Sequence, residues 1–500
     1  MKHLTKLTIL SAIFAIAVFS CKKDKDKDNN KPVATTFTVT VSGTYQYNGA
    51  AHEPSGASVE VKADNTVLTA NTDYTLSYSA NTAAGTATVT ATGKGKYGSN
   101  SKGTGNFTIA KFPITVTANN ASKSKWDDEP TLTYSTAPAL FGADKLSGAL
   151  TRDAGTEKGE YDIKQGTLSG GDNYQITAYT AGKFEIYLFK GDGSQQTPYE
   201  ISKAGQLAEV ALYVNQKFEN YNVKYYILTA DINLNVSPYK DGIGWSPIGI
   251  ESSPFMGNFD GNGHLISGLK IDNSTYSRVG LFGLITGGAV KNLGVVNANI
   301  KGNQYVGGVA GYISNGSVTG CYTTGEVFGS GDVVGGVAGN VRGSNVSNCY
   351  STSAVTSEHS YVGSIAGFVS DNGSVSNCYS TGVISGNDFV GGVAGIVDDG
   401  NLTNCVALNP SVTGVNYVER VAYEDGVLSQ NLAYSGMKVN GAAVSSNNGA
   451  SMHGADITAA AIKADGSFGG RFSTANGWTI ENGKLPGLFG AAVEMPDHIQ

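Results

Sequence analysis

A sequence repeat with a period near 28 residues occupies much of the C-terminal half of this 500-residue chain. A Val-Gly pair recurs five times, at steps of 27, 28, 28 and 28 residues, beginning at Val279, Val306, Val334, Val362 and Val390. A unit this short cannot bury an apolar face alone, so neighbouring copies must stack. Because the copies consist of Val-, Ile- and Thr-rich segments separated by Gly and Asn, each is predicted to form one coil of a β-solenoid.

A second block recurs in register and indicates which side chains point inward. One predicted inward ladder consists of Val290, Val318, Val346, Val375 and Leu402. Stacking would place its members about 4.8 Å apart on adjacent coils. In four copies an Asn follows two residues later, and in the second copy Gly320 takes its place. Asn and Gly both tolerate the left-handed backbone of a bend. The Asn positions are Asn292, Asn348, Asn377 and Asn404.

The next position in the block predicts a ladder of buried thiols. Leu293 in the first copy is followed by Cys321, Cys349, Cys378 and Cys405. A free Cys packs as a small hydrophobe and is among the most buried residue types. Disulfides between adjacent coils remain open, since stacked Cα atoms lie within bonding reach. Four thiols in a line, without a CxxC pair, do not suit the tetrahedral geometry of zinc.

The repeats resemble the GLUG motif over residues 276–415. The resemblance rests on Gly280-Leu-Phe-Gly283, Gly308-Val-Ala-Gly311, Gly336-Val-Ala-Gly339, Ser364-Ile-Ala-Gly367 and Gly392-Val-Ala-Gly395, each followed by a Val-x-Asn-Cys-Tyr-like strand. It implies kinship with secreted and surface proteins of gut bacteria, and with N-terminal parts of some immunoglobulin A proteases. The catalytic HExxH motif of those proteases does not occur in this sequence, so their activity is not expected here.

The N-terminus resembles a bacterial lipoprotein signal of the Bacteroidetes kind. Lys2 and Lys6 precede an apolar run over residues 7–19, which is too short to span a membrane, and Ser20 directly precedes Cys21. The resemblance implies a leader over residues 1–20, acyl chains on Cys21 and a charged tether over residues 21–35. The expected location is the outer membrane, lipid-anchored and exposed at the cell surface. An ordinary cleaved leader is the alternative.

Two β modules are expected after the tether. Residues 36–110 alternate polar and apolar side chains between Gly-rich turns, which is typical of an antiparallel sandwich. Residues 111–188 resemble the MBG family of bacterial immunoglobulin-like modules, through Pro113-Ile-Thr-Val-Thr-Ala118, Gly159-Glu-Tyr-Asp-Ile163, Gly166-Thr-Leu-Ser169 and Asn173-Tyr-Gln-Ile176. The first module resembles such modules more loosely. The resemblance implies that both modules form a stalk.

The predicted fold class is therefore all-β. Two immunoglobulin-like sandwiches precede a right-handed β-helix of about five repeats, flanked by an N-terminal cap over residues 189–275 and by C-terminal coils and a cap over residues 416–500. Ser202 is predicted to N-cap a helix in the first cap, with an apolar face of Leu207, Val210, Val214 and Phe218.

Composition and charge exclude some functions. The net charge is −7, so there is no basic surplus for phosphates and nucleic-acid binding is not expected. The only adjacent acidic pair in the repeats, Asp398-Asp399, is interpreted as a solvated turn rather than as catalytic carboxylates. We therefore predict no enzymatic activity, cofactor or metal.

The expected function is adhesion or binding of a host glycoprotein, matrix or glycan. The candidate contact residues, expected to be exposed on the solenoid, are Tyr312, Tyr322, Tyr350, Tyr361 and Tyr379. Packing between coils is the competing interpretation of these rings. The rival functions are a polysaccharide-degrading enzyme, as other solenoids are, and a purely structural envelope protein.

Overall fold

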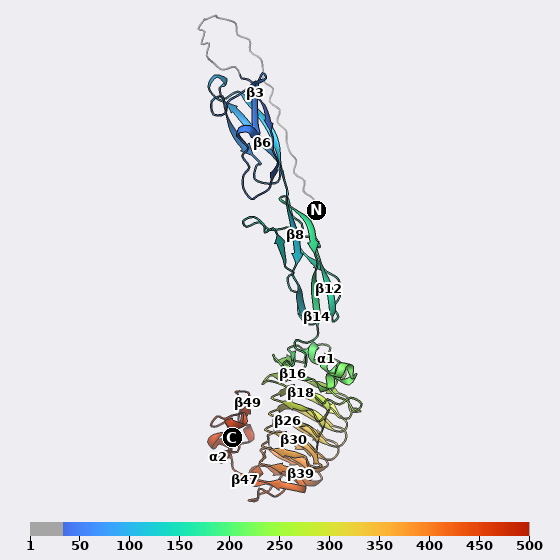
Figure 1. Ribbon diagram of the computed structural model, residues 1–500. Coiled ribbons are helices and arrows are strands. Elements are labelled where there is room, and N and C mark those ends of the chain that lie inside the picture. Colours follow the sequence, from blue (N-terminus) through green and yellow to red (C-terminus); the bar gives the residue numbers. More distant parts are fainter. Residues whose placement is uncertain (1–33, 500) are drawn as a thin grey trace, which may run out of the picture. The chain divides into compact units, whose positions relative to one another are not determined.

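The computed structural model describes residues 34–499, so the predicted leader and Cys21 lie outside the described residues. The chain divides into two compact units. The first contains residues 34–121, 131–154 and 161–184, and the second contains residues 122–130, 155–160 and 185–499. Figure 1 shows β sheets throughout both units, which confirms the all-β prediction.

The first module is a two-sheet sandwich. One sheet has the order β1-β3-β4 and the other the order β2-β7-β6-β5. The strands are β1 (Thr38–Val41), β2 (Tyr45–Gln46), β3 (Val59–Ala63), β4 (Thr66–Val67), β5 (Tyr74–Ser79), β6 (Gly85–Gly93) and β7 (Lys102–Ala110). Alternate side chains, such as Val59 and Val61 of β3, are buried between the sheets.

The second module repeats this arrangement. Its sheets have the orders β10-β8-β13 and β11-β12-β14-β9. The strands are β8 (Phe112–Ala118), β9 (Ala121–Ser124), β10 (Tyr134–Ala137), β11 (Thr151–Arg152), β12 (Gly159–Lys164), β13 (Tyr174–Thr180) and β14 (Gly182–Tyr187). Both modules are thus sandwiches held by apolar packing, as the alternating sequence predicts.

The solenoid consists of stacked parallel strands in three sheets (Figure 1). The first sheet includes β18 (Asn258–Asp260), β22 (Ala289–Lys291), β26 (Ser317–Thr319), β30 (Asn345–Ser347), β35 (Ser374–Ser376) and β39 (Ala394–Thr403), together with β21 (Phe282–Thr286), β25 (Ala310–Ser314), β29 (Ala338–Arg342) and β34 (Ala366–Ser370). The second includes β23 (Gly294–Gly302), β27 (Tyr322–Gly329), β31 (Tyr350–Ser351), β32 (Ala354–Ser357), β36 (Tyr379–Ser380), β37 (Ile384–Ser385), β40 (Val406–Ala407) and β41 (Ser411–Thr413). The third, a five-stranded sheet, joins β24 (Val306–Gly307), β28 (Val334–Gly335), β33 (Val362–Gly363), β38 (Asp388–Gly391) and β42 (Asn416–Glu419).

The register of these strands confirms the predicted inward ladder. Val290, Val318, Val346, Val375 and Leu402 pair in sequence across the first sheet, and all five are fully buried. The four Asn residues of the repeat and Gly320 all have φ between 52° and 60°, as a left-handed bend requires. The four cysteines are free and buried, with the Cys321 and Cys349 amides donating to the Sγ of the next coil at 3.4 Å. Burial raises the pKa of the Cys321 and Cys378 thiols.

The solenoid is longer than five repeats and has about nine turns. β15 (Tyr199–Ile201), β16 (Tyr225–Leu228) and β18 precede β22 in the same sheet, so the region predicted as an N-terminal cap already contains coils. The inward ladder continues backward through Phe259 to Tyr226, at steps of 31 and 33 residues. These longer connections between coils hide the 28-residue period.

One helix covers the start of the stack. Helix α1 (Ala204–Asn215) buries Leu207, Val210 and Val214, as predicted, whereas Phe218 lies outside the helix and is exposed. The prediction that Ser202 is the N-cap is wrong, because the helix begins one residue later, after Lys203. At this end of the helix, Gln206 Oε1 accepts hydrogen bonds from the backbone amides of Ser202 and Lys203, at 2.9 and 3.2 Å.

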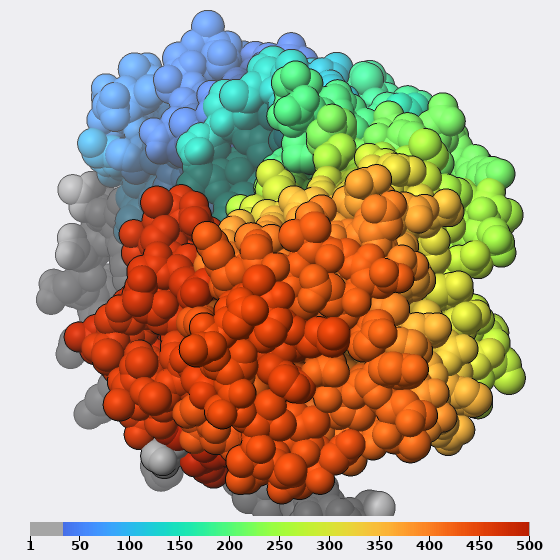
Figure 2. Space-filling model, turned by 90° about the horizontal axis from the view of Figure 1, so that it is seen from below, coloured from blue at the N-terminus to red at the C-terminus, as the bar shows by residue number. Residues whose placement is uncertain are grey.

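The C-terminal segment, defined as residues 459–499, folds back along the side of the solenoid instead of covering its end. It includes α2 (Ala459–Asp465), β48 (Trp478–Thr479) and β49 (Gly487–Leu488), drawn in red in Figure 1. In Figure 2 the red segment lies directly against the orange coils. Phe472, Trp478 and Leu485 form a buried cluster with Tyr350 and Tyr379 of the coils. No helix among residues 34–499 has both the length and the apolar character needed to cross a membrane.

Candidate functional site

A row of aromatic rings lies at one corner of the solenoid. We define the aromatic face as Tyr361, Phe368, Phe389, Tyr417 and Tyr423. Phe389 is in the middle, stacked on Tyr361 with centroids 5.2 Å apart and on Tyr417 at 4.6 Å. Phe368 and Tyr423 flank this row, with Phe368 stacked on Tyr361 at 5.5 Å and Tyr423 edge-on to Phe389 at 5.1 Å. Five rings from three successive coils thus form one continuous surface.

The aromatic face is open to solvent within the second unit. Tyr417 is 51% exposed, and the neighbouring Val415 is 70% exposed. The other four rings are half-buried. Phe389 has a stacked ring on each of its faces, so its exposed part is its edge. Exposed apolar side chains scattered singly are ordinary, but a contiguous row of them is typical of an interaction surface.

The backbone under the aromatic face is strained. Tyr361, Phe389 and Tyr417 have φ of 64°, 53° and 54°, in the left-handed region that bulky residues avoid. This conformation costs a non-glycine residue about 1–2 kcal/mol. Glycine would make the same bend without strain, so the bend alone does not account for a ring there. The equivalent residues Arg278, Tyr305 and Val333 have φ of 61°, 57° and 69°, so the left-handed bend belongs to every coil and the aromatic side chains are added to it.

A smaller aromatic pair lies in earlier coils. Tyr305 and Tyr312 pack edge-on at 5.1 Å, and the Arg278 guanidinium lies over both rings at 5.9 and 5.7 Å. Arg278 also forms an ion pair with Glu251 at 3.0 Å. In the coil between those of Tyr305 and Tyr361, the equivalent corner residue is Val333, which is buried. The smaller pair is therefore separate from the aromatic face.

The structure separates the five tyrosines predicted as contact residues into two groups. Tyr361 lies in the aromatic face and Tyr312 in the smaller pair, both partly exposed. Tyr322, Tyr350 and Tyr379 instead stack on one another at 4.6 and 5.0 Å beneath the C-terminal segment.

The expectation that these three rings are exposed is wrong for Tyr350 and Tyr379. Both are buried, and the Tyr379 hydroxyl donates to the Pro486 carbonyl at 2.6 Å. Burial raises the pKa of both phenols, since it disfavours the charged form. Tyr322 is half-buried at the edge of the C-terminal segment, near Phe489. These three rings therefore pack between successive coils and against the C-terminal segment, as the packing interpretation of the tyrosines expects.

Sequence reasoning missed four of the five rings of the aromatic face, namely Phe368, Phe389, Tyr417 and Tyr423. A signal for part of the row was present, since Tyr361, Phe389 and Tyr417 each precede a Val at 28-residue spacing. The repeat analysis used the Val-Gly pairs but not the residue before them. The column also contains Tyr305 and Val333, which makes its aromatic character uneven.

The acidic pair of the repeats lies at a bend within β39. Asp398 pairs in register with Asp425 of the next coil, while Asp399 is exposed with φ of 50°. This agrees with the interpretation as a solvated turn. Among residues 34–499, no group of three or more His, Cys, Asp or Glu side chains is arranged to hold a metal ion.

Two protein-family models match parts of the chain. Residues 114–185 match the family model described as the MBG domain (YGX type), and residues 302–327 and 358–385 match that of the GLUG motif. The chain carries an MBG domain and GLUG motifs. Both resemblances drawn from the sequence are thus confirmed.

Two relatives share part of the chain. Halomucin of Haloquadratum walsbyi is 37% identical over 156 residues, which is 30% of this chain and 2% of halomucin. A protein of Evansella cellulosilytica, described as a candidate Gly-rich membrane protein, is 32% identical over 117 residues, or 23% of this chain and 13% of that protein. The chain therefore matches only a small part of each relative's length.

A solved structure supports the fold. A crystal structure of a Bacteroides ovatus protein, proposed to be an immunoglobulin A1 protease, aligns with 62% of this chain and 95% of its own, at 27% identity and a TM-score of 0.50. The fold of most of this chain therefore exists in an experimentally determined protein.

Proposed function

We propose that this chain is a cell-surface protein, anchored by lipid on Cys21, that binds a glycan-bearing partner through the aromatic face. The observation that carries the proposal is the continuous stack of Tyr361, Phe389 and Tyr417, held open to solvent on a strained backbone. The chain acts by binding and not by catalysis in this proposal, since Asp398 and Asp399 lie at a solvated bend.

The rings suit a saccharide because both partners are amphipathic. A pyranose ring presents an apolar C–H face that packs against aromatic surface, while its hydroxyls bond polar groups at its edge. Because the rings stack on one another, they offer a sugar the edges of the stack and the half-exposed ring of Tyr417. The phenol hydroxyls of Tyr417 and Tyr423 and the amide of Asn416 supply such groups at the aromatic face. Each contact is weak, so several rings in a row, and several copies on one cell, provide avidity.

A cell-envelope location is supported by the names of the two relatives. One is called halomucin, and the other is described as a membrane protein. Lipid attachment at Cys21 rests on the leader sequence. The variant Cys21→Ala is expected to leave the membrane fraction and appear in the soluble fraction of lysed cells, as judged by fractionation and blotting. Retention of this variant in the outer membrane would contradict the lipid anchor.

Ligand binding is tested with the double variant Phe389→Ala/Tyr417→Ala of the chain lacking its leader. Removal of an aromatic ring stacked on a nucleobase costs about 1–3 kcal/mol. We expect a loss near the lower end of that range for the two rings together, so binding to any glycan or matrix protein retained on an array should weaken about tenfold. Tyr276→Ala is the matched control, because Tyr276 is a 45% exposed ring outside the aromatic face.

The control should bind like the native chain. Equal binding by the native chain and the double variant would show that the aromatic face is not the contact surface. An array on which the native chain binds nothing would leave the purely structural envelope role as the better account.

A further inference from the structure

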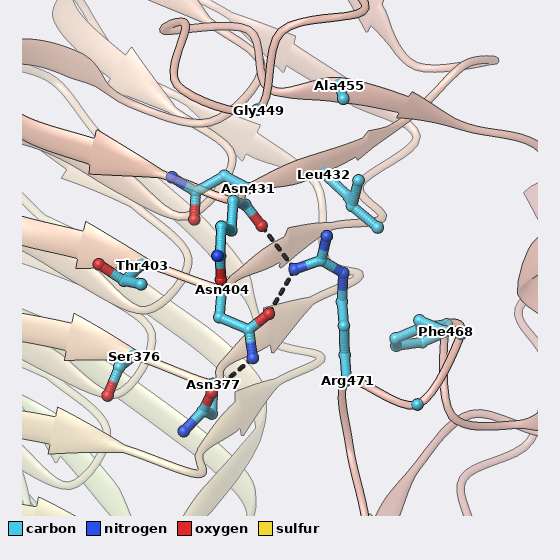
Figure 3. Close-up of a pocket in the computed structure, with 13 residues that line it drawn as sticks. Ser376, Asn377, Thr403, Asn404, Asn431, Leu432, Gly449, Ala455, Phe468 and Arg471 are labelled. Atoms are coloured by element: carbon cyan, nitrogen blue, oxygen red, sulfur yellow. Dashed lines mark hydrogen bonds between the residues drawn. The ribbon is translucent and has the colours of Figure 1, made fainter.

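A polar cavity lies between the last coils and the C-terminal segment, at a different corner from the aromatic face. Its volume is about 890 Å³. One wall is built of hydroxyl and amide side chains from three successive coils, and Figure 3 shows the Asn404 side chain reaching toward Arg471 on the opposite wall. These side chains are Ser376, Asn377, Thr403, Asn404 and Gln430.

The opposite wall presents one cation, Arg471. Its Nη1 donates to Asn404 Oδ1 and to the Gln430 carbonyl, the latter at 2.5 Å (Figure 3). Asn404 in turn donates from Nδ2 to Asn377 Oδ1 at 2.6 Å. The guanidinium therefore has a fixed position while its Nη2 and Nε hydrogens stay available.

No carboxylate forms an ion pair with Arg471 among residues 34–499. In this it differs from Arg278, Arg342 and Arg420, which pair with Glu251, Asp371 and Asp456. Arg471 is about half-buried, and this desolvation lowers its pKa. A cation that is partly removed from water and has no counter-ion is stabilised when an anion binds it.

The loop that carries Arg471 is ordered before any ligand arrives. The Asp465 carboxylate accepts the Ser467 amide at 2.8 Å and the Gly469 amide at 3.2 Å, and Ser467 Oγ accepts the Gly470 amide at 2.8 Å. Gly469 and Gly470 have φ of 74° and 82° and open space where a Cβ would lie. Such preorganisation lowers the entropic cost of binding.

We infer that this cavity binds a carboxylate-bearing saccharide, with Arg471 pairing to the carboxylate and the coil amides and hydroxyls bonding the sugar hydroxyls. A guanidinium recognises a planar carboxylate through paired hydrogen bonds. Leu432 and Phe468 supply the larger apolar side chains of the lining, and most of its other side chains are Ser, Thr, Asn and Gln. This predominance of hydroxyl and amide groups matches a ligand with many hydroxyls better than an acidic peptide. This site goes beyond the aromatic face and does not depend on it.

Calorimetric titration of the chain lacking its leader tests the inference. The acidic probes are oligogalacturonate and a sialic-acid-terminated trisaccharide; lactose and polyglutamate are the neutral and peptide comparisons. At least one acidic saccharide is expected to bind with a dissociation constant of about 1 mM or tighter, and lactose at least tenfold more weakly.

Two variants probe opposite walls of the cavity. Arg471→Gln removes the charge, and Ser376→Tyr places a phenol ring in the cavity while leaving Arg471 unchanged. Each should weaken binding of the acidic saccharide tenfold or more. Arg342→Gln is the matched control, because Arg342 is an exposed Arg outside the cavity. The double variant Phe389→Ala/Tyr417→Ala should bind the acidic probe normally, which separates this inference from the proposed function.

Three results with the native chain would overturn the inference. These are absence of binding by both acidic saccharides, equal binding of lactose, or binding of polyglutamate as tight as that of the acidic saccharide. Native affinity of both Ser376→Tyr and Arg471→Gln, in chains whose C-terminal segment stays protected from hydrogen exchange, would place the binding elsewhere.

Discussion

Replacement of Asp456 by Asn is expected to destabilise the last coils by about 3 kcal/mol. Arg420 is completely buried, and its Nη1 lies 2.7 Å from the Asp456 carboxylate on β47 (Ala455–Ile457). Removing one partner of a buried ion pair typically costs about 3–5 kcal/mol, because the remaining charge is left buried and unpaired. We expect the lower end of this range, since Asp456 is 31% exposed and the Gly454 carbonyl still accepts from Arg420.

Native-state hydrogen exchange over residues 400–460 is the suitable measurement, because long repeat arrays do not unfold in one step. The double variant Arg420→Met/Asp456→Asn should recover much of the loss, since it removes both charges together. The matched control is Arg342→Ala, which breaks an exposed pair with Asp371 and should cost less than about 1 kcal/mol. Equal effects of Asp456→Asn and Arg342→Ala would contradict this account of the buried pair.

Replacement of Phe472 by Ala is expected to release the C-terminal segment from the coils. Phe472 is buried and contacts Trp478, Phe468 and Tyr379 at centroid distances of 4.6, 5.4 and 5.8 Å. Truncation of a buried Phe to Ala costs about 3–5 kcal/mol. The loss falls on a segment with its own small core, so local detachment should precede unfolding of the coils.

Limited proteolysis followed by mass determination detects this detachment as early cleavage within residues 459–499 while the coils stay intact. Tyr417→Ala is the control, because that ring is half-exposed and its removal leaves no cavity in a core. Native protease resistance of Phe472→Ala would show that the aromatic cluster does not hold the segment in place.

The solenoid could be predicted from sequence because its determinants repeat. The ladder of Val290 and its equivalents follows from one apolar position per coil, and Asn348 and its equivalents follow from one bend per coil. The number of turns could not be predicted, because the connections around Phe259 are several residues longer than the later ones. A period is visible only where the loops between coils have equal length.

The exposure of each ring could not be predicted in the same way. Tyr350 and Tyr379 follow the Cys of the repeat and Tyr361 precedes the Val-Gly pair, and neither position shows by itself whether its ring is covered. The C-terminal segment covers Tyr350 and Tyr379 and leaves Tyr361 partly exposed. That segment does not follow the repeat, so its docking position depends on side-chain complementarity between distant parts of the chain. The Arg471 cavity arises from the same docking and has no signature in any single coil.

Cysteine labelling on living cells tests the central claim most directly, namely that the aromatic face is open at the cell surface. Val415→Cys places a thiol beside Tyr417, while the four native cysteines of the coils are buried. Leu485→Cys, beneath the C-terminal segment, is the buried comparison. A membrane-impermeant maleimide should label Val415→Cys on intact cells and leave Leu485→Cys and the native protein unlabelled. Labelling of Val415→Cys only after the outer membrane is opened would contradict the surface location, and absence of labelling in the purified folded protein would contradict the open aromatic face.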